Sequence, residues 1–215
     1  MPRVSPILHR NSQKRIYKKG ASYFVTSATY QRQPYFGDPI LADLFVHVLW
    51  SGSQLKDFVV HGYVVLPDHV HLLIEPRGKA NYSDAMQNVK RVFSLQANQI
   101  MFSNVESAGD DIYRHLPTEQ QNPYATLRWS KLLGEFHRLF MNTHGPNHLF
   151  PKFKWQKSFR DHLIRNRMDL ENHISYIRNN PVKHELVKVS EDWPWMWVHG
   201  MPAPHLVHPS NLKLL

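Results

Sequence analysis

The fold is decided by one stretch in the first third of the chain, which reads Leu66-Pro67-Asp68-His69-Val70-His71-Leu72-Leu73-Ile74. Because side chains alternate between the two faces of a β-strand, we expect His69 and His71 to share one face. The apolar residues between and after them would then point to the other face, into a core. Two neutral imidazoles on one face can share a metal ion. A pair of surface histidines on a half-exposed strand fits the same pattern.

The sequence on either side of this stretch predicts a small sheet. Phe58–Leu66 is expected as a strand that forms a hairpin with the histidine strand, since Pro67-Asp68 is typical of a turn. Further strands are expected at 23–30 and 154–164. Helices are expected at 39–51, 83–102 and 127–141, and from a cap at Asn166 to about 179, before Pro181. This order predicts the α+β class, with a ferredoxin-like antiparallel sheet covered by helices on one face.

Length and composition indicate one domain. The chain has 215 residues, of which 42% are hydrophobic and 12% aromatic, so it can bury a sizeable core. We expect a basic arm at 1–20, a single domain at 21–200 with an insertion at about 103–150, and a tail at 201–215. Cysteine is absent from the sequence, which excludes disulfides and thiolate chemistry. No apolar run has the length of a membrane span.

The charge favours a polyanionic partner. The formal net charge is +9, and no acidic residue precedes Asp38. We therefore expect phosphate contacts from basic side chains in three parts of the sequence. They are Arg10, Lys14, Arg15, Lys18, Lys19, Lys90, Arg91, Lys154, Arg160 and Arg165. The tail tryptophans Trp193, Trp195 and Trp197 could stack on unpaired bases or pack the tail against the core.

A second motif reads Ile174-Ser175-Tyr176-Ile177-Arg178-Asn179-Asn180-Pro181-Val182-Lys183-His184. Tyr176 and Asn180 are four residues apart, so a helix would place a phenol and an amide on one side. An amide oxygen is a hard ligand for a divalent cation. The same residues also fit a tyrosine at the edge of a core and an asparagine that caps a helix before proline. His173 could act as a general base or be an ordinary helix-surface residue.

Together these motifs resemble the HUH single-tyrosine transposases, and among them the REP-associated tyrosine transposases. The matching segments follow the family's order and lie at 23–30, 64–73, 155–165, 176–184 and 191–195. The resemblance implies that Tyr176 is a nucleophile. It also implies that His69, His71 and Asn180 hold a divalent metal ion, Mg²⁺ or Mn²⁺. The implied partner is single-stranded or hairpin DNA of the REP type.

The resemblance further implies strand cleavage and rejoining through a 5′-phosphotyrosine intermediate, without an organic cofactor or a membrane. A monomer or homodimer in the bacterial cytoplasm, associated with the nucleoid, would fit. The chain departs from the family in a longer segment at 103–150, in Glu185 where relatives often carry Gly, and in Met196-Trp197. Three alternatives stay open: a catalytically silent DNA-binding regulator on the same fold, an HUH replication or mobilisation initiator, and a metal-dependent hydrolase of small phosphoesters. The positive charge disfavours the last.

Overall fold

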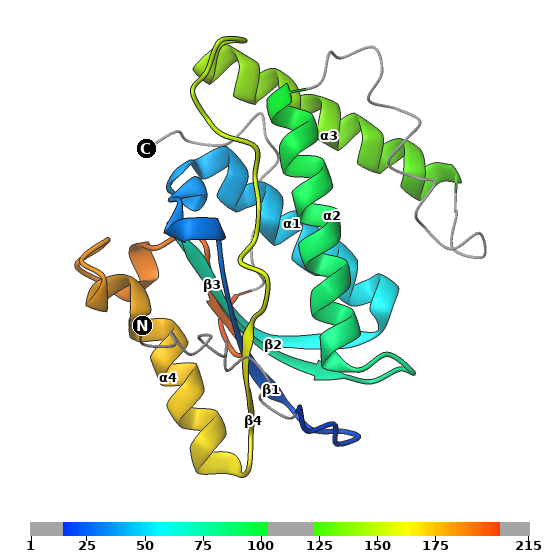
Figure 1. The fold of residues 1–215 in the computed structure, drawn as a ribbon. Helices are drawn as coiled ribbons and strands as arrows, with labels where there is room; N and C mark the ends of the chain where they lie inside the picture. Colours follow the sequence, from blue (N-terminus) through cyan, green and yellow to red (C-terminus); the bar gives the residue numbers. More distant parts are fainter. Residues whose placement is uncertain (1–14, 103–122, 203–215) are drawn as a thin grey trace, which may run out of the picture.

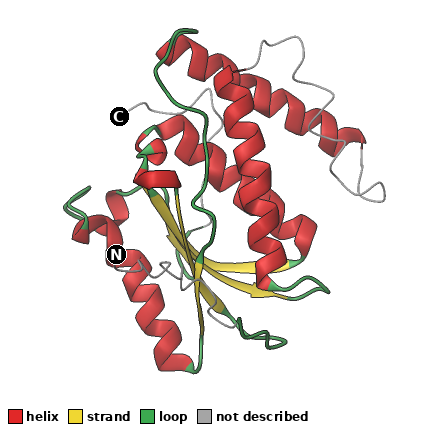
Figure 2. Ribbon diagram, in the orientation of Figure 1, coloured by secondary structure: helices red, strands yellow, loops and turns green. Residues whose placement is uncertain are grey.

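The computed structural model describes residues 15–102 and 123–202. Its main elements are β1 (Tyr23–Ala28), α1 (Pro39–Lys56), β2 (Phe58–Leu66), β3 (His69–Pro76), α2 (Tyr82–Phe102), α3 (Pro123–His144), β4 (Arg160–Leu163), α4 (Arg167–Lys183) and β5 (Met196–Val198). The strands form one sheet in the order β4-β1-β3-β2-β5, and every neighbouring pair is antiparallel. The first four strands have the ferredoxin-like order, so the predicted α+β class is confirmed (Figures 1 and 2).

Helices cover both faces of this sheet. Tyr23 of β1 stacks on Tyr82 of α2 with ring centroids 4.0 Å apart, whereas the next residue, Phe24, lies 4.6 Å from the ring of His173 on α4. Because neighbouring strand residues point to opposite faces, α2 and α4 lie on opposite sides of the sheet, as Figure 1 shows. The prediction that helices cover a single face is therefore wrong. The chain leaves the edge strand β4 toward the histidine-bearing face, and α4 packs there.

The main core lies between the sheet and the helices α1, α2 and α3. α1 begins where Asp38 Oδ1 accepts a hydrogen bond from the backbone N–H of Leu41 at 3.0 Å, which caps an otherwise apolar helix. α3 packs mainly on α2 and adds side chains to the same core. The buried residues that join these layers include Val70, Leu72, Ile74, Phe93, Phe136 and Phe140. The expectation that the apolar residues of the histidine strand face the core is confirmed.

Several element ends differ from expectation. α4 continues through Pro181 to Lys183, because proline in a last turn removes only one N–H from the ladder. β4 is four residues long instead of the eleven expected. The preceding segment meets the end of β1 through a hydrogen bond from the Gln156 N–H to the Ala28 carbonyl at 2.9 Å, and through a bridge between Trp155 and Thr29 just beyond β1. Within the described residues, no helix is both long and apolar enough to cross a membrane.

The tail tryptophans pack against the core. Trp193, Trp195 and Trp197 are each at most 9% exposed, and Trp193 Nε1 donates a hydrogen bond to the Val65 carbonyl at 2.9 Å. Of the two roles considered for them, packing is confirmed, and these rings are not available to stack on bases.

Candidate active site

The two histidines of β3 form a buried pair on the face covered by α4. His69 and His71 are 7% and 4% exposed, and their ring centroids lie 4.8 Å apart at nearly a right angle. Cross-strand neighbours of β3 are Ala28 beside His69 and Thr26 beside His71, both on β1. The alternation of the strand therefore brings both imidazoles to one face, as expected.

Each imidazole is held through its Nδ1 atom. Thr26 Oγ1 lies 2.8 Å from Nδ1 of His71, and Asp68 Oδ1 lies 2.5 Å from Nδ1 of His69. Asp68 is held in turn by Arg32 Nη1 at 3.2 Å. Hydrogen bonds at Nδ1 fix the ring orientations and leave the Nε2 atoms for another partner. The Nε2 atom of His71 is buried and has no hydrogen-bond partner.

The site keeps both histidines neutral near pH 7. Burial is the main cause that lowers the pKa of His71 to about 3, and the neighbouring His69 adds to it. Burial also lowers the pKa of His69, although hydrogen bonding to Asp68 partly opposes this. A neutral imidazole has a free lone pair, so both side chains have the protonation state that metal binding requires.

α4 brings Tyr176 to the histidines and carries Asn180 one turn further along the helix. The ring of Tyr176 lies edge-on to His71, with centroids 5.2 Å apart, and is 39% exposed. Asn180 follows one turn later and is 1% exposed; its Nδ2 donates to the Tyr176 carbonyl at 2.9 Å. The Asn180 Oδ1 atom is buried without a partner. A glycine in β2 permits this close packing, since a Cβ at Gly62 would lie 3.3 Å from Cδ1 of Ile177.

The donor set fits a divalent metal ion. His71 Nε2 and Asn180 Oδ1 are two buried polar atoms that have no partner within residues 15–102 and 123–202, and such groups are costly unless something binds them. Two imidazole nitrogens and one amide oxygen suit Mn²⁺ or Mg²⁺, with nitrogen donors favouring Mn²⁺. Two of the residues expected to hold a metal therefore carry a buried polar atom that has no hydrogen-bond partner among the described residues.

A second cluster also has potential ligand atoms. Atoms of His162, Asp169 and His173 lie within 4.8 Å of one another. However, Asp169 Oδ2 already accepts hydrogen bonds from His162 Nε2 and from the N and Nε atoms of Arg165, at 2.9 to 3.1 Å. Among the described residues, none of the cluster's atoms is a buried group without a partner. The hydrogen bonds of this cluster are complete without a metal ion. It therefore fits a metal ion less well than the set of His69, His71 and Asn180 does.

Two further residues at the end of α4 lie at the site, and neither was predicted. The ring of His184 lies 5.6 Å from that of His69, and Lys183 Nζ lies 5.6 Å from the centre of the Tyr176 ring. Their spacing could have predicted this, because residues seven and eight positions after Tyr176 lie on the same side of a helix as Tyr176. That pattern was hidden by the expectation that the helix stops before Pro181.

The residues expected to contact DNA separate into two groups. Arg15 stacks on Phe159 at 4.0 Å, and Lys90 Nζ donates to the Gln156 carbonyl at 3.0 Å, so both take part in packing. Burial lowers the pKa of Lys90 to about 8. The group whose side chains are exposed comprises Lys18, Lys19, Arg91, Lys154, Arg160 and Arg165. Arg10 and Lys14 lie outside the described residues.

Of these exposed cations, Arg160 is the one whose place in the sheet relates it to the site, because it lies on β4. It pairs with Thr26 across β1 and β4, and Thr26 pairs with His71 on the other side. Directly paired residues share a face, so Arg160 projects on the face that carries the histidines. Arg165 is instead bonded to Asp169.

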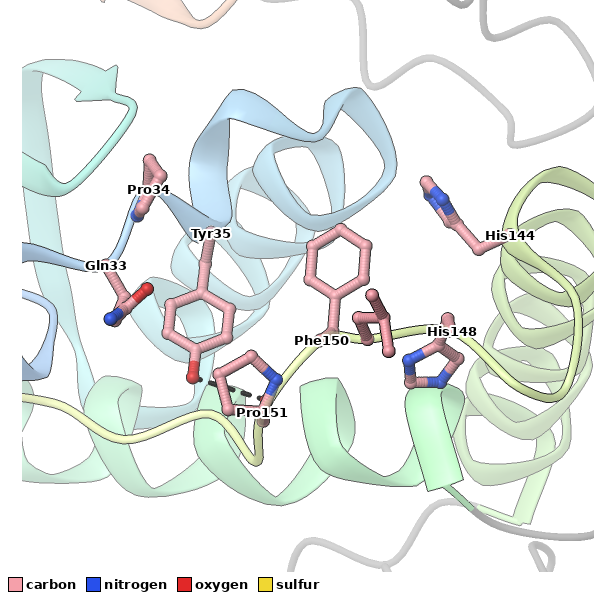
Figure 3. Close-up of a pocket in the computed structure, with 8 residues that line it drawn as sticks. Gln33, Pro34, Tyr35, His144, His148, Phe150 and Pro151 are labelled. Carbon is pink, nitrogen blue, oxygen red and sulfur yellow. Dashed lines mark hydrogen bonds between the residues drawn. The ribbon is translucent and has the colours of Figure 1, made fainter.

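A shallow pocket of about 440 Å³ lies beyond the end of β1. It is lined by Gln33, Pro34, Tyr35, His144, His148, Leu149, Phe150 and Pro151 (Figure 3). The Tyr35 hydroxyl donates to the Pro151 and Lys152 carbonyls at 3.2 and 3.0 Å, which ties the two walls together. None of His69, His71, Tyr176 and Asn180 lines this pocket.

Known proteins resemble the chain across both sequence and fold. A family model described as "Transposase IS200 like" matches residues 17–114. A protein of Haemophilus influenzae assigned as a REP-associated tyrosine transposase is 28% identical over 191 residues, which cover 88% of this chain and 86% of that protein. The REP-associated tyrosine transposase of Escherichia coli K12 is 23% identical over 190 residues, covering 86% and 81%. Among solved structures, a REP-associated tyrosine transposase bound to a REP hairpin has a similar fold, with a TM-score of 0.53, 23% identity and coverage of 85% of this chain and 79% of that one.

Proposed function

We propose that the chain is an IS200-like transposase that cleaves and rejoins single-stranded or hairpin DNA through Tyr176. The family model over residues 17–114 and the two similar REP-associated tyrosine transposases support this proposal. The observation that carries the proposal is the meeting of Tyr176 with a buried pair of histidines. REP hairpins are the proposed substrate, because a protein of the same fold was solved with one. Such a substrate places the protein with the chromosome in the cytoplasm.

We propose that His69, His71 and Asn180 hold the divalent ion. When bound, the ion would polarise the scissile phosphate and offset the charge that develops on it. Thr26 and Asp68 keep the two imidazoles oriented through their Nδ1 atoms. The buried amide oxygen of Asn180 has no other partner and completes the donor set.

The proposed reaction is a phosphoryl transfer to the tyrosine. The phenolic oxygen of Tyr176 attacks the phosphorus, the P–O3′ bond breaks, and the 3′ oxygen leaves with a proton as a hydroxyl. The 5′ phosphate is then bonded to the protein. Rejoining reverses these steps with a 3′ hydroxyl as nucleophile, so the bond energy is kept and no nucleotide cofactor is needed. The 39% exposure of Tyr176 gives a DNA strand access to its ring.

Exposed cations around the site support a nucleic-acid substrate. Lys183 lies over the Tyr176 ring, and Arg160 projects from the same sheet face as His71. We propose that these side chains contact phosphates on either side of the scissile one. Arg91, Lys154, Lys18 and Lys19 are further from the site in the fold and are proposed to contact a hairpin stem.

The test uses labelled hairpin oligonucleotides, taken from repeats flanking the gene, with Mn²⁺ or Mg²⁺ on a denaturing gel. A covalent protein–DNA band that needs the metal and disappears in Tyr176→Phe supports the proposal. A band that persists in Tyr176→Phe places the nucleophile elsewhere. Binding without any covalent band, across all repeat hairpins, favours a catalytically silent regulator. Release of phosphate from small esters without an adduct favours a hydrolase.

A further inference from the structure

Asp169 joins the start of α4 to the edge strand β4. Its Oδ2 atom accepts a hydrogen bond from Nε2 of His162, on β4, at 2.9 Å. The same atom accepts from the backbone N–H and the Nε of Arg165, at 3.0 and 3.1 Å. The side chain is buried, and its hydrogen bond with His162 holds the pKa of Asp169 well below its ordinary value. A buried, ionised carboxylate with three donors fixes the geometry between a strand and a helix.

His173 extends this link one turn along the helix. Its Nδ1 donates to the Asp169 carbonyl at 2.7 Å, which fixes the tautomer. Its ring is nearly parallel to that of His162, at an angle of 21° and a centroid separation of 4.8 Å. His162 therefore contacts both the Asp169 carboxylate and the His173 ring, and the orientation of His173 depends on both neighbours.

Phe24 connects His173 to the candidate active site. The Phe24 ring lies 4.6 Å from that of His173 on one side. On the other it lies 5.7 Å from Tyr176, edge-on, and 5.3 Å from His71, stacked. Among the described residues, no hydrogen bond holds the phenolic oxygen of Tyr176, so these ring contacts set the direction of the phenol.

We infer that Asp169 is a positioning residue for the Tyr176 nucleophile, acting through His162 and His173 on the packing of the tyrosine ring against Phe24. The inference rests on the proposed function. Asp169 lies two helical turns from Tyr176 and has no place in the donor set, so it acts without touching DNA or metal. A displacement of about 1 Å can lower the rate of a chemical step about a hundredfold, which sets the size of the expected effect.

The first experiment compares Asp169→Asn with Glu171→Gln. Glu171 is a matched control, because it is an exposed acidic residue of the same helix whose ion pair, in the part of the chain that the structure describes, is with Arg167. We expect Asp169→Asn to form the covalent adduct about 10- to 100-fold more slowly in single turnover. Its hairpin Kd, Mn²⁺ affinity and melting temperature should stay within twofold or a few degrees of wild type. Glu171→Gln should match wild type in every measurement.

A second pair guards against a variant that fails to fold. His162→Ala should slow adduct formation as Asp169→Asn does, whereas His162→Arg should restore the rate, because a guanidinium can donate to the Asp169 carboxylate. A wild-type rate in Asp169→Asn and in His162→Ala would overturn the inference. So would a loss of rate that merely follows a loss of hairpin affinity or of stability.

A third measurement separates this inference from the proposed function. With 3-fluorotyrosine at position 176, the ¹⁹F resonance should shift in Asp169→Asn and not in Glu171→Gln, with no DNA present. If the wild type forms no adduct but the resonance shifts, the proposed function fails and the positioning role stands. If the wild type forms the adduct and the resonance and rate are unchanged in Asp169→Asn, only the positioning role fails.

Discussion

Replacing Asn180 by alanine should affect stability in opposite ways with and without metal. Without metal, the substitution removes one hydrogen bond worth about 1 kcal/mol, from Nδ2 to the Tyr176 carbonyl. It also removes a buried, unpartnered Oδ1, whose desolvation costs about 1–3 kcal/mol. These effects oppose each other, and their sum makes metal-free Asn180→Ala about 0–2 kcal/mol more stable than wild type.

With Mn²⁺ at about 100 times its wild-type Kd, binding stabilises the folded wild type by about 2.7 kcal/mol. If loss of one ligand weakens binding about 10- to 100-fold, the variant gains only about 0.4–1.4 kcal/mol. Addition of Mn²⁺ should therefore lower the unfolding free energy of the variant relative to wild type by about 1.3–2.3 kcal/mol. At this chain length that corresponds to about 3–9 °C in melting temperature. The assay is thermal and urea unfolding with and without Mn²⁺.

The matched control is Asn179→Ala, which removes an exposed amide at the neighbouring position and should respond to Mn²⁺ as wild type does. If Asn180→Ala lost the same stability with and without Mn²⁺, Asn180 would be a helix-end residue with no part in metal binding. A gain from Mn²⁺ equal to that of wild type would refute the ligand assignment directly.

Three further changes test the same site. Gly62→Ala should lower the free energy of unfolding by about 1–3 kcal/mol in urea unfolding. The added Cβ would lie 3.0 Å from Val198 Cγ1 and 3.3 Å from Ile177 Cδ1. An unchanged urea midpoint would show that α4 can move away freely. Asp68→Ala should weaken Mn²⁺ binding about 10- to 100-fold in calorimetry by releasing the His69 ring, and wild-type affinity would contradict this. Metal-free stability should fall as pH decreases from about 6.5 toward 3. In that pH window His71 binds a proton in the unfolded chain but not in the folded protein, where burial lowers its pKa to about 3. If the slope of unfolding free energy against pH were unchanged in His71→Gln, the effect would belong to other groups.

Local patterns were sufficient to predict the centre of the sheet. The apolar alternation of the histidine strand and the Pro67-Asp68 turn specify a hairpin within twenty residues of chain, and β2 and β3 have the expected bounds within one residue. The Asp38 and Asn166 caps depend on residues three positions away, and both are present. Such features could be predicted because neighbours in sequence determine them.

Features that depend on distant residues could not be predicted. Lys90 looked like a phosphate contact, yet Gln156, 66 residues away, accepts its hydrogen bond. The hydrogen bond between Asp169 and His162 has no signal in the sequence, because only the folded sheet brings the two residues together. The face that α4 covers depends on where β4 pairs, and no periodicity within α4 specifies that.

Tyr176 and the two histidines are placed relative to one another by β1, a strand that carries none of them. On β1, Thr26 fixes His71 through Nδ1, and Phe24 packs against Tyr176. These two residues share a face and are separated by about 7 Å along the strand. A single rigid segment therefore sets the separation of the two halves of the site, although His71 and Tyr176 are far apart in sequence. α3 packs on α2, on the opposite side of the sheet from α4, so it has no part in setting this separation.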